Sequence, residues 1–442
     1  MATKTQGKSD GLSLIQLVWI GTGQVVGAGI ITITGAAIMV TGRSVWVAYA
    51  VAVLMGLFRI LPSIFFTSAM VTPGGNYGIL TRTFGERIGG LVTINSLVQW
   101  TVRGTAVIAL GMYIHSVFPH IDQKLAAALI WIALIVANCM GVDMMAKLQS
   151  FGTPLLLLSL MLFAILGMIH ARPDSFDFAS PEFITAGAAG FGSAVVMLNY
   201  STVGQAMMSS LSTRCKRPTR DLPNAMLIST AIILVLYVSV SFAAANVLPM
   251  AEIAGKPLTP TAKLLMPAAL FAAFIIGGPI MALLTTMNSG VPSNAMPVVA
   301  GAKAGWVPAF FAKENRYHSP WISYVIIGVI GLIPMLAGIS VADITNFCVA
   351  LGSINTFMMI TSAFYLPTKF ASEWNASHLH LPKAVYYPIM VVSGLVQTYV
   401  TVISLKSLSL PLALINICVL TCAVTYGIVR FRTGAISRVE TV

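Results

Sequence analysis

The sequence has few charged residues, and none of its acids falls in the middle of a long apolar run. Only 9% of the 442 residues are charged, and the 13 Asp and Glu residues fall in tails, connections or the ends of apolar runs. A proton-coupled membrane carrier usually needs a titratable group inside its pathway, so this absence argues against obligatory proton symport. The sequence also has no HExxH, phosphate loop or nucleophile–base pairing, so we expect no enzyme activity, no metal site and no cofactor.

Cysteines and long polar segments are scarce as well. The five cysteines are scattered without metal-ligand spacing on a polar connection, so we expect neither a disulfide framework nor a metal cluster. The longest polar connections, near 171–185, 249–267 and 302–320, are too short for an ATPase, kinase or receptor domain. A membrane protein without an energy-converting domain is usually a channel or a secondary transporter.

Apolar residues fill most of the remaining sequence. They make up 57% of it, the mean hydropathy is +0.88, and they recur in runs of about 20 residues, enough to cross about 30 Å of hydrocarbon. The first run is too long for a removed signal peptide. The pattern predicts an all-α polytopic membrane protein with twelve transmembrane helices, over 12–41, 46–70, 90–118, 125–142, 148–170, 186–211, 225–248, 268–301, 321–341, 344–367, 385–404 and 408–430.

The net charge of +12 is explained by membrane topology and does not indicate a polyanionic partner. With a cytoplasmic amino terminus, seventeen of the 25 Lys and Arg residues fall on cytoplasmic segments, six on outer segments, and Arg59 and Arg103 within apolar runs. This bias predicts that both tails, 1–11 and 431–442, are cytoplasmic. We expect a multi-pass protein of the plasma membrane, specifically a bacterial inner membrane, surrounded by lipid and without a nucleic-acid partner.

Two apolar runs contain residues that weaken a helix near the middle of the membrane. Glycines cluster over 21–29 in the first run, and the polar stretch 199–205 interrupts the sixth. Unwound backbone survives inside a membrane only where it lines a cavity, and paired breaks in two halves indicate an inverted-repeat transporter. The predicted halves are 12–170 and 186–367, followed by two more helices over 385–430. Glycines that merely allow close helix packing are the alternative reading.

Several short motifs resemble one transporter family. Gly27-Ala-Gly-Ile30, Thr72-Pro-Gly-Gly-Asn-Tyr77, Arg217-Pro-Thr-Arg-Asp-Leu-Pro223 and Gly305-Trp-Val-Pro308 occur in the family's order and at fitting distances. They resemble the amino acid–polyamine–organocation (APC) superfamily, especially bacterial amino acid antiporters such as arginine:agmatine exchangers. The resemblance implies a five-plus-five inverted repeat with broken helices 1 and 6, the LeuT-like fold, and alternating access.

The resemblance also implies a substrate site between the two breaks. The helix 1 break would bind a carboxylate, which suits the free N–H groups and positive dipole end of a half-helix that begins at 28–29. Carbonyls of helix 6 would receive an amino group. The candidate substrate-binding residues are Gln24, Val25, Gly27, Ala28, Gly29, Arg103, Tyr200, Ser201, Thr202, Gly204, Asn288 and Asn355.

Arg59 and Arg103 are the two cations inside apolar runs. Burying either costs about 2.5 kcal/mol or more, and no acid within a run is available to pair with it. Arg103 matches the position that faces the distal part of the pocket in related antiporters. We expect it to receive an anionic group at the far end of the substrate. A purely structural role stays open for Arg103 and is the expected role for Arg59.

The sequence thus favours a secondary transporter of a small amino acid or analogue, working by exchange with a counter-substrate, with an acidic side group preferred. A cationic amino acid or polyamine exchanger, a channel-like facilitator and a transporter-like sensor remain alternatives. Sodium coupling is also open, because carbonyls of helix 1 together with Ser289 or Ser293 could bind the ion without a carboxylate. A homodimer is compatible with the pattern but not required by it.

Overall fold

The computed structural model describes residues 11–27, 29–339, 341–406, 408–433 and 436. Within these residues the regular secondary structure is helical, and one isolated β-bridge joins Leu12 to Cys215. Ala28 falls outside the described residues.

The described part of the chain forms nineteen α-helices and eight π-helical or 3-10 segments, in this order. The α-helices are α1 (Leu14–Val25), α2 (Thr34–Thr41), α3 (Val45–Ala69), α4 (Asn76–Phe84), α5 (Gly89–Val98), α6 (Arg103–Val117), α7 (Gln123–Cys139), α8 (Val142–Ile169), α9 (Gly187–Asn199), α10 (Pro218–Asn246), α11 (Met250–Ile253), α12 (Thr259–Leu265), α13 (Ala268–Ile275), α14 (Met281–Lys303), α15 (Trp321–Leu336), α16 (Val341–Lys369), α17 (Ala371–Ala376), α18 (Lys383–Lys406) and α19 (Leu410–Arg432). The π-helical segments are η1 (Gly29–Ile33) and η7 (Ile276–Ile280), and the 3-10 segments are η2 (Gly42–Ser44), η3 (Glu86–Ile88), η4 (Gln99–Val102), η5 (Tyr200–Thr202), η6 (Gly204–Arg214) and η8 (Ala309–Ala312).

The apolar runs of the sequence all overlap helical segments. Within the described residues, seven helical stretches are long and apolar enough to cross a membrane, and three apolar helices, α1, α7 and α15, are shorter. Several helices extend beyond their predicted limits: α8 begins at Val142 and α10 at Pro218. Their polar first turns carry Asp143 and Asp221, because acids stabilise a helix N-terminus without adding to the apolar pattern.

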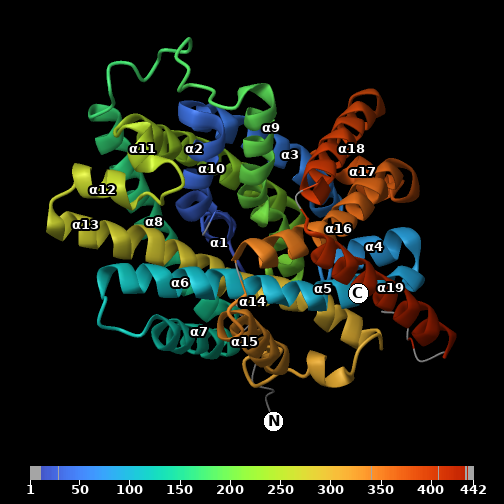
Figure 1. The fold of residues 1–442 in the computed structure, drawn as a ribbon. Helices are drawn as coiled ribbons and strands as arrows, with labels where there is room; N and C mark the ends of the chain where they lie inside the picture. The colour runs from blue at the N-terminus through green and yellow to red at the C-terminus, as the bar shows by residue number, and fades with distance from the viewer. Residues whose placement is uncertain (1–10, 28, 340, 407, 434–435, 437–442) are drawn as a thin grey trace.

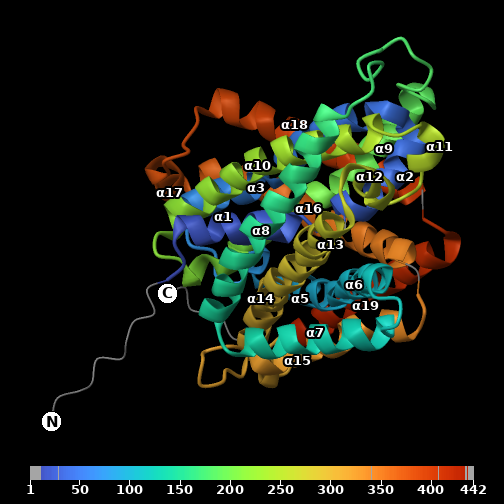
Figure 2. The ribbon, with the colours of Figure 1, turned by 90° about the vertical axis from the view of Figure 1, so that its left-hand side faces the viewer.

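Two groups of helices pack around the centre of the molecule (Figures 1 and 2). The first group comprises α1, α3, α9 and α10, and the second comprises α5, α6, α7, α14 and α15. Helix α8 contacts α1 and α10 on one side and α14 on the other, so it joins the groups. Helices α18 and α19 lie at the periphery, where only 22% and 17% of their most apolar stretches are buried. Their exposed apolar side chains suit a lipid surface.

One end of the bundle is closed by an ion pair between a helix connection and a long loop. The Arg43 side chain is buried between α2 and α3, where its Nε donates to Oε2 of Glu182 at 2.9 Å and its Nη1 to the Ala245 carbonyl at 3.2 Å. The backbone N–H groups of Arg43 and Ser44 donate to the carbonyls of Glu182 and Phe183. The loop before α9 is therefore fixed to the C-terminal end of α2.

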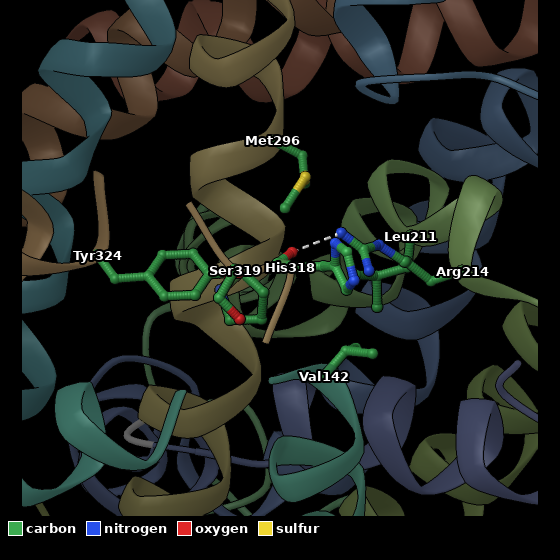
Figure 3. Close-up of a pocket in the computed structure, with 8 residues that line it drawn as sticks. Val142, Leu211, Arg214, Met296, His318, Ser319 and Tyr324 are labelled. Carbon is green, nitrogen blue, oxygen red and sulfur yellow. Dashed lines mark hydrogen bonds between the residues drawn. The ribbon is translucent and has the colours of Figure 1, made fainter. Parts of the chain in front are cut away.

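The opposite end of the bundle is closed by contacts between the two helix groups. Arg214, at the end of η6, donates from Nη2 to the His318 carbonyl at 2.8 Å, beside a small pocket lined by Val142, Leu211, Pro292, Met296 and Tyr324 (Figure 3). Leu12 exchanges backbone hydrogen bonds with Arg214 and Lys216 at this end. Burial, and then the charge of Asp221, raises the pKa of the neighbouring Cys215 thiol to about 12, so this thiol stays neutral.

Candidate functional site

The first span is interrupted near its middle. Helix α1 opens with a capping box between Ser13 and Gln16 and ends at Val25. Val26 is extended, with φ −74° and ψ 91°, and helical structure resumes as a π-helical turn at Gly29. The chain thus leaves the α-helix where the glycine cluster predicted it, and backbone groups are freed at this point.

The second interruption lies between α9 and the long 3-10 segment η6. Asn199 ends α9, and Val203 separates η5 from η6 with φ −118° and ψ 6°. Because 3-10 hydrogen bonds are poorly aligned, runs longer than three or four residues are uncommon and often mark hinges. The 11 residues of η6 are therefore suited to rearrange.

The two interruptions face each other, and glycine makes this approach feasible. A Cβ on Gly29 would overlap the side chain of Ser201, and a Cβ on Gly204 would lie 3.2 Å from the Gln24 carbonyl oxygen. Gly27 faces the Thr286 hydroxyl on α14 with no room for a Cβ. The breaks and α14 therefore meet at one point in the interior.

Hydroxyl groups from neighbouring helices form hydrogen bonds with backbone carbonyls at the two breaks. Thr286 Oγ1 lies 3.0 Å from the Gly23 carbonyl and 3.3 Å from the Val26 carbonyl. The Tyr237 hydroxyl of α10 lies 3.0 Å from the Val25 carbonyl and 3.3 Å from the Ser201 carbonyl. A hydroxyl donates one proton, so each can satisfy only one of its two carbonyls at a time. The carbonyl that the hydroxyl leaves over can accept a hydrogen bond from another donor.

Arg103 lies beside this meeting point, at the first residue of α6. Its guanidinium packs against Gly290 of α14, and its buried Nε has no hydrogen-bond partner. Tyr200 and Cys348 are its electrostatic neighbours, and Tyr200 is 37% exposed. Among the described residues, no carboxylate lies within ion-pair distance of Arg103. The site therefore contains a guanidinium group whose positive charge is not balanced by any described carboxylate.

Some candidates from the sequence are engaged in helix packing. Asn288 donates to the Met145 carbonyl at 3.0 Å and to Gln149 Oε1 at 3.2 Å, and it accepts from Asn138. Thr202 is fully buried, and its hydroxyl lies within 3.3 Å of carbonyls on α3 and α9. Both side chains thus join helices instead of facing the breaks.

Other candidates retain free polar atoms. Gln24 donates from Nε2 to Met207 Sδ at 3.4 Å, while its buried Oε1 has no partner. The Oδ1 atom of Asn355 on α16 is also buried without a partner. Val25, Gly27, Gly29, Ser201 and Gly204 form the backbone of the two breaks, whereas Ala28 lies outside the described residues. Within the described part of the chain, no group of three or more His, Cys, Asp or Glu residues could hold a metal ion.

A many-helix apolar bundle with a polar site at two facing helix breaks defines a class, the polytopic membrane proteins that carry small solutes. Residues 12–429 match the model of the family described as amino acid permease, and the chain belongs to this family, part of the APC superfamily. Members of this family are secondary transporters of amino acids rather than enzymes.

Individual relatives are distant. The chain is similar to the branched-chain amino acid permease BcaP of Bacillus subtilis (strain 168), with 23% identity over 87% of this chain and 85% of the relative. A methylthioribose transporter of the same organism is 23% identical over 85% of both chains. The human cationic amino acid transporter 4 is 27% identical over 52% of this chain and 40% of its own length. The names of these relatives cover different solutes, so family membership does not fix the substrate.

Replacement of Tyr237 by phenylalanine tests the shared hydroxyl. The ring would keep its edge contact with Tyr49, at 5.2 Å between centroids, while the contacts with the Val25 and Ser201 carbonyls are lost. We expect the KM for the transported amino acid to rise about three- to tenfold, the value of one hydrogen bond. This KM is measured from initial uptake rates in proteoliposomes. An unchanged KM would mean that this hydroxyl does not organise the site.

Proposed function

We propose that the protein is an amino acid exchanger that prefers substrates with an anionic side group. The observation that carries the proposal is the unneutralised Arg103 guanidinium beside the two facing helix breaks. The α-carboxylate would bind free N–H groups of the helix 1 break, and the α-amino group would donate to carbonyls of the helix 6 break. The side-chain anion would then reach Arg103 from the opposite side.

Alternating access supplies the transport cycle in this proposal. The chain would cross the membrane twelve times, with two inverted halves and both termini in the cytoplasm, as the excess of positive charge suggests. The Arg43–Glu182 pair and the Arg214–His318 contact lie at opposite ends of the bundle, so they are suited to act as outer and inner closures. The inner closure does not depend on the protonation of an acid, because its acceptor is the backbone carbonyl of His318.

A counterflow experiment tests exchange. Proteoliposomes would be loaded with unlabelled L-glutamate, L-leucine or buffer, and uptake of labelled L-glutamate and L-leucine would be followed at equal pH on both sides. We expect internal amino acid to raise the initial rate about tenfold or more, because the empty carrier must otherwise return alone. Uptake that is equally fast without internal substrate would indicate a facilitator. Uptake driven by a pH gradient alone would contradict the absence of proton coupling.

A further inference from the structure

Arg59, the second cation inside the apolar runs, has neutral partners. It lies in α3, and its Nε donates to Oε1 of Gln397 on α18 at 2.7 Å. Its Nη1 donates to Oδ1 of Asn199 at the end of α9. Among the described residues, no carboxylate lies within ion-pair distance of Arg59. A guanidinium kept inside a membrane span without a counter-ion is costly, so these amide contacts indicate a role beyond simple packing.

The Asn199 side chain fixes the helix 6 break to α3. Its Nδ2 donates to the Ala52 carbonyl at 2.7 Å and to Thr202 Oγ1 at 3.3 Å. The Thr202 hydroxyl also lies 3.3 Å from the Ala52 carbonyl. An asparagine amide can turn either its oxygen or its nitrogen toward a neighbour. Donation from Arg59 to Oδ1 and acceptance by the Ala52 carbonyl together select the orientation in which the NH2 group faces Ala52.

The α3 surface is shaped for this contact. Ala52, Gly56 and Arg59 lie on one face of the helix, at spacings of four and three residues. Gly56 has no room for a Cβ, because the Thr202 hydroxyl packs directly against it. One face of α3 therefore provides the Ala52 carbonyl as an acceptor, the close approach that Gly56 allows and the Arg59 guanidinium. Each of these contacts Asn199 or Thr202, at the end of α9 and in the break after it.

Helix α18 holds the other side of the guanidinium. Gln397 is fully buried, and its Nε2 donates to Thr401 Oγ1 at 2.9 Å, which leaves Oε1 aimed at Arg59. Helix α18 contacts α3, α9 and α16. A peripheral helix, outside both predicted repeats, thus contacts the same guanidinium that donates to Asn199 before the helix 6 break.

We propose that Arg59 is a positioning residue of the substrate site. It orients the Asn199 amide, and through it holds residues 200–203 against α3, with Gln397 as a brace on α18. The inference rests on the proposed function only in assuming that the helix 6 break binds the substrate. A neutral residue at position 59 removes the charged donor to Oδ1 and leaves the Asn199 amide held only by its contacts with Ala52 and Thr202. This change loosens the break without removing any atom that touches substrate.

Hydrogen exchange tests the positioning without any substrate. In Arg59→Gln, we expect backbone amides over 199–206 to exchange about tenfold faster than in the wild type, because a hydrogen bond to a charged group is lost. Residues 22–27 at the helix 1 break should keep their exchange rates. Arg172→Gln is the control, because Arg172 pairs with Asp174 on an exposed loop at the opposite end of α9 from the break. Unchanged exchange over 199–206 would overturn the proposal.

Transport kinetics separate positioning from direct binding and from folding. We expect Arg59→Gln and Asn199→Ala each to raise the KM about tenfold at a nearly unchanged maximal rate per folded protein, and the double variant to be no worse than Asn199→Ala alone. Arg59→Lys, which keeps the charge but reaches one acceptor, should recover part of the affinity. Additive losses would instead make Arg59 a direct ligand, and a loss of folded protein at constant KM would make it structural. If the wild type transports no amino acid, the proposed function fails, and hydrogen exchange alone decides the role of Arg59.

Discussion

Replacement of Arg103 by alanine removes transport of acidic substrates while neutral substrates continue to be carried. We expect kcat/KM for L-glutamate or L-aspartate to fall about 100-fold or more, because a charge-assisted, two-pronged contact is lost. For L-leucine the change should stay below about threefold, since no neutral side chain needs the guanidinium. Paired uptake assays of the two substrate types, at equal amounts of folded protein, measure this difference.

Two further variants at the same position sharpen the result. Arg103→Lys keeps the charge but presents a compact ammonium instead of a planar fork, so we expect partial transport of acidic substrates with a raised KM. Arg103→Gln removes the charge and should favour neutral substrates as strongly as alanine does. If all substrates lost transport equally in every variant, Arg103 would be a folding residue and the anionic preference would be wrong.

The positions of the helix breaks could be predicted from sequence because their causes are local. Glycines at 21, 23, 27 and 29, and the polar stretch after Leu198, weaken the helix where they stand, and the structure interrupts both spans there. The helix ranges followed from apolar runs of about 20 residues for the same reason. The polar first turns of α8 and α10 went unpredicted, because they do not contribute to an apolar pattern.

The partners of the broken backbone could not be predicted, because they come from distant parts of the chain. Tyr237 is 212 residues away from the carbonyl of Val25, and Thr286 is 263 residues away from that of Gly23. The sequence around a tyrosine or threonine in an apolar helix does not indicate which backbone carbonyl its hydroxyl will contact. The same reason explains why Asn288 and Thr202 entered the candidate site, although the structure uses both to join helices. Depth in the membrane can be estimated from sequence, but the direction of a side chain around its helix cannot.

Substitution of Gly29 by alanine should abolish transport of every amino acid. The added Cβ would overlap the Ser201 side chain and approach its Cα to 3.3 Å, so the helix 1 and helix 6 breaks must separate. Both ends of the proposed zwitterion site belong to these two segments, and a shift of about an ångström in such a site costs about 100-fold in rate. Uptake and counterflow of L-glutamate and L-leucine measure the loss, which should affect acidic and neutral substrates alike, unlike the loss at Arg103.

A second substitution can restore the space that the first one fills. Ser201→Gly removes the atoms that the new Cβ would overlap, so the Gly29→Ala/Ser201→Gly double variant should recover at least about a tenth of wild-type transport, and the coupling between the two sites should be large. Gly394→Ala is the matched control, because a Cβ there meets no heavy atom closer than 4.0 Å on the peripheral helix α18. It should transport at the wild-type rate. If Gly29→Ala were fully active, the two breaks would not need to touch, and a binding site built from their facing backbones would be excluded.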